Sequence, residues 1–112
     1  MTQQKYMLIY RRDESGSTTI TPEQMQATIK LWDAWKQKFK EVLDPGDGLK
    51  PGGRVLRAGL VTDGPYVEGK EVLGGYSIIG ANSYEHALEV ARACPITGMP
   101  AYCIEVREMA GY

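Results

Sequence analysis

Histidine and cysteine, the residue types that most often hold metals, are scarce in this 112-residue chain. It has one histidine, His86, which excludes a metal site made of several histidines from one subunit. Its two cysteines, Cys94 and Cys103, lie nine positions apart without the spacing of metal ligands, so we interpret them as buried thiols and not as a disulfide. We therefore expect neither a metal nor another cofactor.

The chain also lacks a basic excess and a long hydrophobic run. Lysine and arginine number 13 against 14 aspartates and glutamates, whereas a nucleic-acid-binding domain gathers basic residues on one face. The cluster of Lys36, Lys38 and Lys40 fits the solvent side of a helix. The apolar run Tyr6–Tyr10 is too short for a signal peptide or a membrane span. We expect a cytoplasmic protein that binds neither nucleic acid nor membranes.

Hydrophobic residues make up 43% and charged residues 24% of the chain, which fits a single globular domain over residues 1–112. Residues 44–53 read DPGDGLKPGG, and so many glycines and prolines predict a loop, either an insertion or a mobile flap. Strands are expected at Lys5–Tyr10, Arg54–Val61, Val72–Ile79 and Ala101–Glu108.

Two helices are expected between these strands. Residues 21–24 read TPEQ, a capping box with proline at the first helical position, and they predict a helix of about five turns. Its apolar stripe runs from Met25 to Val42 at steps of three and four. Ser83 predicts the cap of a second helix, with Tyr84, Ala87, Leu88 and Ala91 on its buried side, which ends at Cys94-Pro95.

The resulting order β-α-β-β-α-β predicts an α+β fold of the ferredoxin-like kind, with both helices on one face of an antiparallel sheet. On the last strand Tyr102, Ile104 and Val106 alternate with Cys103, Glu105 and Arg107. The helix-free face then needs a cover, and a second subunit supplies it in many proteins. We therefore expect a homodimer.

Residues 62–76 read TDGPYVEGKEVLGGY and are the most informative segment. Asp63-Gly64-Pro65 predicts a compact turn. The pair Gly74-Gly75 lets a backbone or a ligand approach closely. The segment is not a phosphate-binding loop, because it lacks the required glycine spacing and the Lys-Ser/Thr ending. Three charged residues stand between the turn and the glycines, so we interpret the segment as the wall of a site.

Asp63 is the candidate catalytic residue, and three roles stay open for its carboxylate. As a general base it would need a raised pKa, from burial or from a neighbour such as Glu68. It can instead anchor a ligand, or hold the turn by accepting backbone hydrogen bonds. Lys70 can neutralise an anionic substrate, or form a surface ion pair with Glu68 or Glu71.

Two arginines and two tyrosines complete the set of candidate ligand-binding residues. Arg54 and Arg107 can each grip a carboxylate with two hydrogen bonds, although Arg107 shares a strand face with Glu105 and can be satisfied there. Tyr10 and Tyr76 can line an aromatic pocket or be half-buried residues of the sheet.

Four segments together resemble the DGPF branch of the YCII-related family: KYMLIY at residues 5–10, TDGPYVEGKEVLGGY at 62–76, ARACP at 91–95 and IEVREM at 104–109. The resemblance runs from Lys5 to Met109, with Tyr66 where the family has phenylalanine. It implies a ferredoxin-like fold that dimerises into an α+β barrel, with a cleft near the Asp63 turn.

The resemblance also implies functions. Some relatives resemble small dehalogenating lyases with a His–Asp pair as acid and base. Asp63 matches that aspartate, whereas the histidine has no obvious match, since His86 falls on an expected exposed position of the second helix. Other members resemble accessory proteins found alongside alternative sigma factors. We expect a small anionic or aromatic ligand to bind in a cleft near Asp63, at or close to the dimer interface. The alternatives are a cofactor-independent lyase or isomerase and a regulatory accessory protein.

Overall fold

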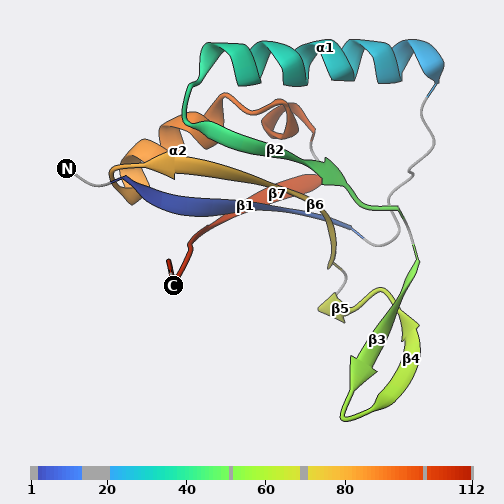
Figure 1. Ribbon diagram of the computed structural model, residues 1–112. Coiled ribbons are helices and arrows are strands. Elements are labelled where there is room, and N and C mark those ends of the chain that lie inside the picture. The colour runs from blue at the N-terminus through green and yellow to red at the C-terminus, as the bar shows by residue number, and fades with distance from the viewer. Residues whose placement is uncertain (1–2, 14–20, 51, 69–70, 100, 112) are drawn as a thin grey trace.

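The computed structural model describes residues 3–13, 21–50, 52–68, 71–99 and 101–111. Figure 1 shows its elements in chain order, and their bounds are β1 (Gln4–Asp13), α1 (Pro22–Lys38), β2 (Val42–Gly48), β3 (Gly53–Arg57), β4 (Leu60–Gly64), β5 (Val67–Glu68), β6 (Glu71–Ala81), α2 (Tyr84–Arg92), the 3₁₀-helix η1 (Pro95–Gly98) and β7 (Tyr102–Glu108).

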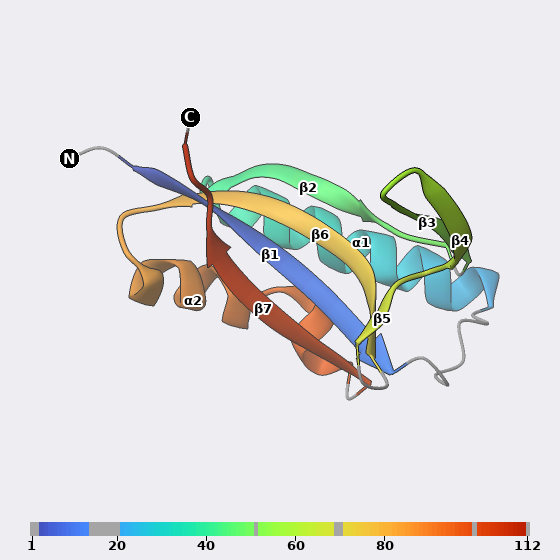
Figure 2. The ribbon, with the colours of Figure 1, turned by 90° about the horizontal axis from the view of Figure 1, so that it is seen from below.

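The main sheet has the strand order β2-β6-β1-β7, with every neighbouring pair antiparallel, and the short β5 pairs with β6. Both helices lie on one face of this sheet, and the opposite face carries no helix in the part of the chain that the structure describes (Figure 2). This mixed α+β arrangement is consistent with the ferredoxin-like fold expected from the sequence. No helix among the described residues is long and apolar enough to cross a membrane.

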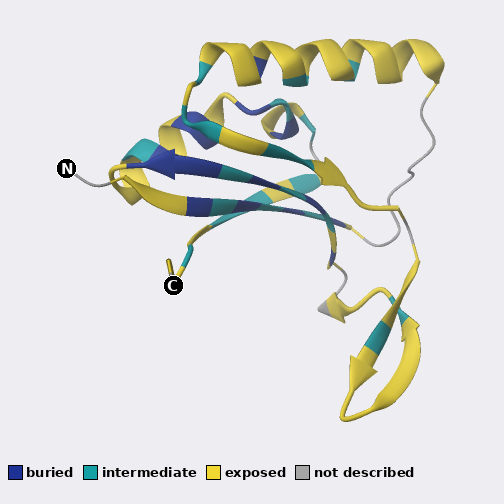
Figure 3. Ribbon diagram, in the orientation of Figure 1, coloured by how far each residue is buried: buried dark blue, intermediate teal, exposed yellow. Residues whose placement is uncertain are grey.

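The core lies between the sheet and the helices, and alternation along the strands creates it (Figure 3). Tyr6, Leu8 and Tyr10 of β1 point inward and are at most 3% exposed, as expected for every second residue of a strand. They pack with Ile79 of β6 and Val90 of α2. The inward side of β7, predicted from its alternation, packs against the same core.

The N-terminus of α1 is confirmed, because Thr21 Oγ1 accepts from the Gln24 backbone and the Gln24 side chain accepts from the Thr21 backbone. Its predicted C-terminus is wrong. The helix ends at Lys38, and Val42 instead begins β2 and pairs with Ile79 of β6. Valine is β-branched and suits a pleated strand. Val42 therefore fits the spacing of the helical stripe in the sequence, although it belongs to a strand in the structure.

The predicted loop at residues 44–53 is wrong in its first half, because Val42–Gly48 forms the edge strand β2. Its register with β6 shifts twice, and an edge strand with bulges tolerates Pro45. Asp44 Oδ1 accepts from the Gly46 backbone N–H at 2.8 Å, which supports the irregular segment. Gly46 has a φ of 68°, and a Cβ there would collide with the carbonyl oxygen of Tyr76.

The predicted single strand Arg54–Val61 is also wrong, because the chain reverses inside it. β3 and β4 form a separate two-stranded hairpin that projects from the main sheet (Figure 1). Ala58 (φ 50°) and Gly59 (φ 80°) form its two-residue turn. Asp63 therefore lies in β4, opposite Arg54, and not in the compact turn that its Gly-Pro neighbours indicated.

The second helix begins as predicted, since Ser83 Oγ accepts from the His86 backbone N–H at 3.1 Å. Its buried side is narrower than predicted, because Tyr84 is 48% and Leu88 38% exposed. The prediction of two buried thiols holds for Cys94 alone. Cys103 is exposed, because its position on β7 directs it to the helix-free face, and both cysteines are free.

Candidate functional site

A cleft of about 880 Å³ opens between α1 and one end of the main sheet. Its walls are α1 on one side and, on the other, the C-terminal half of β1, the glycine-rich part of β2 and the glycine pair of β6; η1 and the start of β7 close it. Small-molecule sites commonly have a volume of this size. The cleft is therefore the candidate site.

Apolar and aromatic side chains make up most of the cleft wall. They include Met25, Ile29, Trp32, Ile96, Met99 and Tyr102. Met25 and Ile29 belong to the predicted apolar stripe of this helix, yet they are 50% and 52% exposed. The reason is that this part of α1 lies over the open cleft, whereas Trp35, one turn further on, is buried and donates from Nε1 to the Val90 carbonyl at 3.0 Å.

The floor of the cleft is a hydrogen-bonded chain that starts at Tyr10. The Tyr10 hydroxyl donates to Ser77 Oγ at 2.7 Å, and Ser77 Oγ donates to the Pro45 carbonyl at 2.7 Å. The Cys94 thiol donates to the same tyrosine oxygen at 3.5 Å. Burial, and next the neighbouring Cys94, raise the pKa of Tyr10 far above its usual value. Tyr10 is therefore a neutral structural donor that ties β1 to β6 and β2.

Arg12 brings a positive charge to the cleft. Its position is in phase with the inward-facing residues of β1, and the side chain is only 8% exposed. Its Nη1 donates to the Asp13 carbonyl at 3.3 Å. The ion pairs found among the described residues join Arg11, Arg54, His86 and Arg107 to carboxylates, and none of these pairs involves Arg12.

The pair Gly74-Gly75 is where the sequence predicted a close approach, and the structure shows what approaches. A Cβ on Gly74 would lie 3.2 Å from Tyr102 Cε2 and 3.5 Å from Arg12 Cδ. A Cβ on Gly75 would lie 2.9 Å from the Asp47 carbonyl oxygen of the neighbouring strand. The first glycine therefore makes room for the ring of Tyr102 beside Arg12, and the second lets β2 approach β6.

Two carboxylates and a second cation also line the cleft: Asp33 on α1, Asp47 on β2 and Lys50 after it. One oxygen of Asp47 accepts from the backbone N–H of Gly48 at 2.8 Å. With Arg12, the formal charges of these lining residues cancel. The cleft is thus an apolar space with a few charged groups of both signs at its wall.

The sequence-predicted site residues do not gather in one place. Tyr10 and Tyr76 line the cleft. Asp63 is on the projecting hairpin, where its side chain is 97% exposed and one oxygen lies 3.9 Å from Arg54 Nε. Neither Asp63 nor Arg54 lines the cleft. An acid/base role for Asp63 stays a prediction, and it requires a second chain or a ligand to cover this carboxylate.

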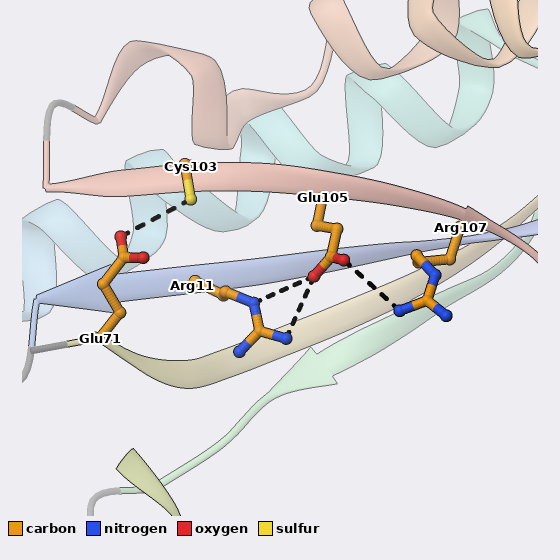
Figure 4. Close-up of polar contacts among 5 residues, drawn as sticks. All are labelled: Arg11, Glu71, Cys103, Glu105 and Arg107. Carbon is orange, nitrogen blue, oxygen red and sulfur yellow. Dashed lines mark hydrogen bonds and ion pairs between the residues drawn. The ribbon is translucent and has the colours of Figure 1, made fainter. Parts of the chain in front are cut away.

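The remaining candidates lie elsewhere. Glu68 ends β5, and its side chain, like all of Lys70, is outside the described residues. Arg107 is on the helix-free face, 3.5 Å from Glu105, as its strand position indicated. Glu105 also pairs with Arg11 at 3.1 Å, and Cys103 donates to Glu71 at 3.8 Å on the same face (Figure 4). These partially exposed contacts form a polar network on that face.

Sequence reasoning missed Arg12, although a signal for it exists. The run of apolar residues ends at Tyr10, where the predicted strand Lys5–Tyr10 stops, whereas β1 continues to Asp13. Continuing the alternation of Tyr6, Leu8 and Tyr10 by one more step reaches Arg12. An arginine that continues the alternation of a buried strand face is therefore a sequence signal for a charged side chain on the inward face.

Two comparisons with known proteins concern the family of the chain. An uncharacterised protein, R00369, of Rhizobium meliloti (strain 1021) is 34% identical to this chain over 119 residues, which cover 96% of this chain and 93% of that protein. Residues 5–110 match the YCII-related domain family. The match spans β1 to β7 and thus includes the whole cleft. The chain belongs to the YCII-related domain family.

Proposed function

We propose that this YCII-related domain binds a small ligand with an apolar body, aromatic or aliphatic, in the cleft between α1 and the sheet. The observation that carries the proposal is the cleft of about 880 Å³ whose wall is mostly apolar. Half-exposed Met25 and Ile29 give further support, because α1 holds them over the cleft without packing them against the sheet. A ligand would remove their apolar surface from water.

Aromatic compounds suit this wall well. The rings of Trp32 and Tyr10 are tilted against each other, with their centroids 5.6 Å apart. The ring of Tyr102, at the start of β7, lies beside Gly74. Aromatic rings offer large, rigid contact areas, and the thioethers of Met25 and Met99 adapt to the shape of a ligand. A flat ring system between α1 and the start of β7 would contact both walls.

Nuclear magnetic resonance offers a test with an internal control. Trp32 is in the cleft wall, whereas the indole N–H of Trp35 is buried and bonded to the Val90 carbonyl. We expect naphthalene-2-carboxylate, 2-naphthylmethanol or octanoate to shift the Trp32 indole signal, assigned with Trp32→Phe, more than that of Trp35. Dissociation constants of about 10 μM to 1 mM are expected for ligands of this size.

A matched pair of helix variants locates the binding. Ile29 and Leu31 are both exposed apolar residues of α1, at 52% and 57%, but only Ile29 is in the cleft wall. Ile29→Asn should weaken binding severalfold through lost apolar contact, and Leu31→Asn should not. No shift at millimolar concentrations of any of the three probes, or equal effects of the two variants, would contradict the proposal.

We also propose that the chain forms a homodimer through its helix-free sheet face and the β3–β4 hairpin. Leu56 and Leu60 on the hairpin are 71% and 72% exposed, and Val61 is 64% exposed. A two-stranded hairpin without further packing is marginally stable in water, so a covering partner would stabilise it. The polar network around Glu105 supplies both charge signs for pairing.

Within the family, we place the chain in the DGPF branch because residues 63–66 read DGPY.

A further inference from the structure

We propose that Arg12 is the anion-binding residue of the cleft, and that the ligand is an amphipathic monocarboxylate. Its carboxylate would pair with the Arg12 guanidinium while its apolar body lies against α1 and the start of β7. The inference rests on the proposed ligand-binding function of the cleft and goes further by naming the chemical class of the ligand and the residue that selects it.

Burying the positive charge of Arg12 is costly without a partner. Arg12 is 8% exposed, and a guanidinium stays protonated at any physiological pH. A buried charge is stable only when a partner compensates the loss of hydration. Among the described residues, the hydrogen bond found for this guanidinium goes to the Asp13 carbonyl at 3.3 Å, and no ion pair compensates its charge. A ligand carboxylate would supply that partner.

The Arg12 side chain also has access to the cleft. Within the described part of the chain, no side-chain nitrogen or oxygen is both fully buried and without a hydrogen-bond partner. The guanidinium nitrogens that lack a protein partner must therefore reach the surface, and Arg12 lines the cleft. The planar guanidinium can donate two parallel hydrogen bonds to one carboxylate, which fixes orientation as well as charge.

Gly74 lies beside the Arg12 side chain and makes room for the ring of Tyr102. A Cβ on Gly74 would lie 3.5 Å from both Arg12 Cγ and Cδ, and only 3.2 Å from the ring of Tyr102. Gly74 sits at the register shift between β1 and β6, which adds one residue to β6 at this point. The sheet thus changes register near Arg12, which lines the cleft. The ring of Tyr102 lies at the same place and can contact the apolar body of a ligand.

The other charges of the cleft limit the ligand to a single negative charge. Asp33 and Asp47 line the same space, and only Lys50 adds to the positive charge of Arg12. Two carboxylates would repel a phosphate or a dicarboxylate more strongly than a monoanion. One carboxylate on an apolar body therefore fits the cleft better than a polyanion does.

The test compares two ligands that share the naphthyl ring and differ in the polar group, the charged naphthalene-2-carboxylate and the neutral 2-naphthylmethanol, by isothermal titration calorimetry. We expect wild-type protein to prefer the carboxylate by about 10- to 100-fold, the usual range for a charge-assisted hydrogen bond. Arg12→Gln should abolish this preference while still binding the alcohol, and Arg12→Lys should keep part of it. Arg92→Gln, at an exposed arginine of α2 that does not line the cleft, should leave the preference unchanged.

A second variant protects the test against an unfolded Arg12→Gln protein. Arg12→Met replaces the charge with an apolar chain of similar length, which a buried position tolerates better, and it should also abolish the preference for the carboxylate. Equal binding of both ligands to wild type, or an unchanged preference in Arg12→Gln or Arg12→Met, would overturn the role of Arg12 and leave the cleft intact. Binding of neither ligand would remove the proposed function together with this inference.

Discussion

His86 Nε2 lies 2.8 Å from Glu41 Oε2, and His86 Nδ1 accepts a hydrogen bond from the backbone N–H of Asn82 at 3.0 Å. Both ring nitrogens are therefore occupied by contacts within the chain. The prediction of an exposed helix position is wrong, since the side chain is only 23% exposed. The ring ties the start of β2 to the first turn of α2, at the end of the molecule away from the Asp63 hairpin (Figure 1).

The first prediction concerns the pH dependence of this contact. The hydrogen bond from His86 lowers the pKa of Glu41 below its ordinary value. A carboxyl group with a depressed folded-state pKa stabilises the fold above its unfolded pKa, and this contribution is lost as the pH falls through the folded value. Glu41→Gln should therefore lower the free energy of unfolding by about 1 kcal/mol at pH 7 and by much less near pH 3.

Urea unfolding of both proteins across this pH range measures the effect. Glu89→Gln is the matched control, because Glu89 lies on α2 beyond its first turn, where the helix dipole acts little, and is exposed. It should change the unfolding free energy little at either pH. An equal loss for Glu41→Gln at pH 3 and pH 7 would show that the contact does not depend on the carboxylate charge.

The second prediction concerns the reactivity of Cys103. Partial burial, and next the charge of Glu71, raise the pKa of this thiol. The thiolate is the reactive form, so a higher pKa lowers the alkylation rate at neutral pH. Glu71→Gln should lower the pKa and raise the rate of reaction with iodoacetamide at pH 7.5 by about two- to fivefold, given the weak coupling of partly exposed groups.

The buried Cys94 is the internal reference for this experiment. Burial also raises the pKa of Cys94, so a Cys103→Ser protein should react far more slowly than wild type. Mass spectrometry of the alkylated peptides separates the two sites. An unchanged Cys103 rate in Glu71→Gln would contradict the electrostatic coupling across the strands.

The sequence allowed much of the fold to be predicted, because local signals and tertiary structure agree there. The capping box of residues 21–24, the Ser83 cap and the alternation along β7 each place an element correctly. The sequence alone did not show that Pro45 lies in an edge strand, because its proline and glycines are typical of a loop. Only the pairing of Val42–Gly48 with β6 makes this segment a strand.

The same limit explains the two main gaps at the candidate site. The β3–β4 turn carries Ala58 at φ 50°, where asparagine or glycine would have signalled a hairpin. Arg12 is polar, so it ended the apolar pattern of its strand in sequence while continuing the strand in space. A buried charge is favourable only where tertiary contacts or a ligand compensate it. The residues of the strand alone do not show whether such a partner is present.

The last prediction tests the dimer through the projecting hairpin. Leu56 and Leu60 expose more than two thirds of their surface, and each buried leucine side chain contributes about 1.5 to 3 kcal/mol to association. We expect a dimer by sedimentation velocity at 10 to 50 μM, concentrations of the order at which modest interfaces associate. Leu56→Glu with Leu60→Glu should raise the dimer dissociation constant by about tenfold or more, because two charges would then be buried without partners. Leu31→Glu, at a leucine of α1 that is 57% exposed, controls for the effect of surface charge and should leave the dimer unchanged. A monomeric wild type would contradict the dimer, and a double variant that associates as well as wild type would place the interface away from the hairpin.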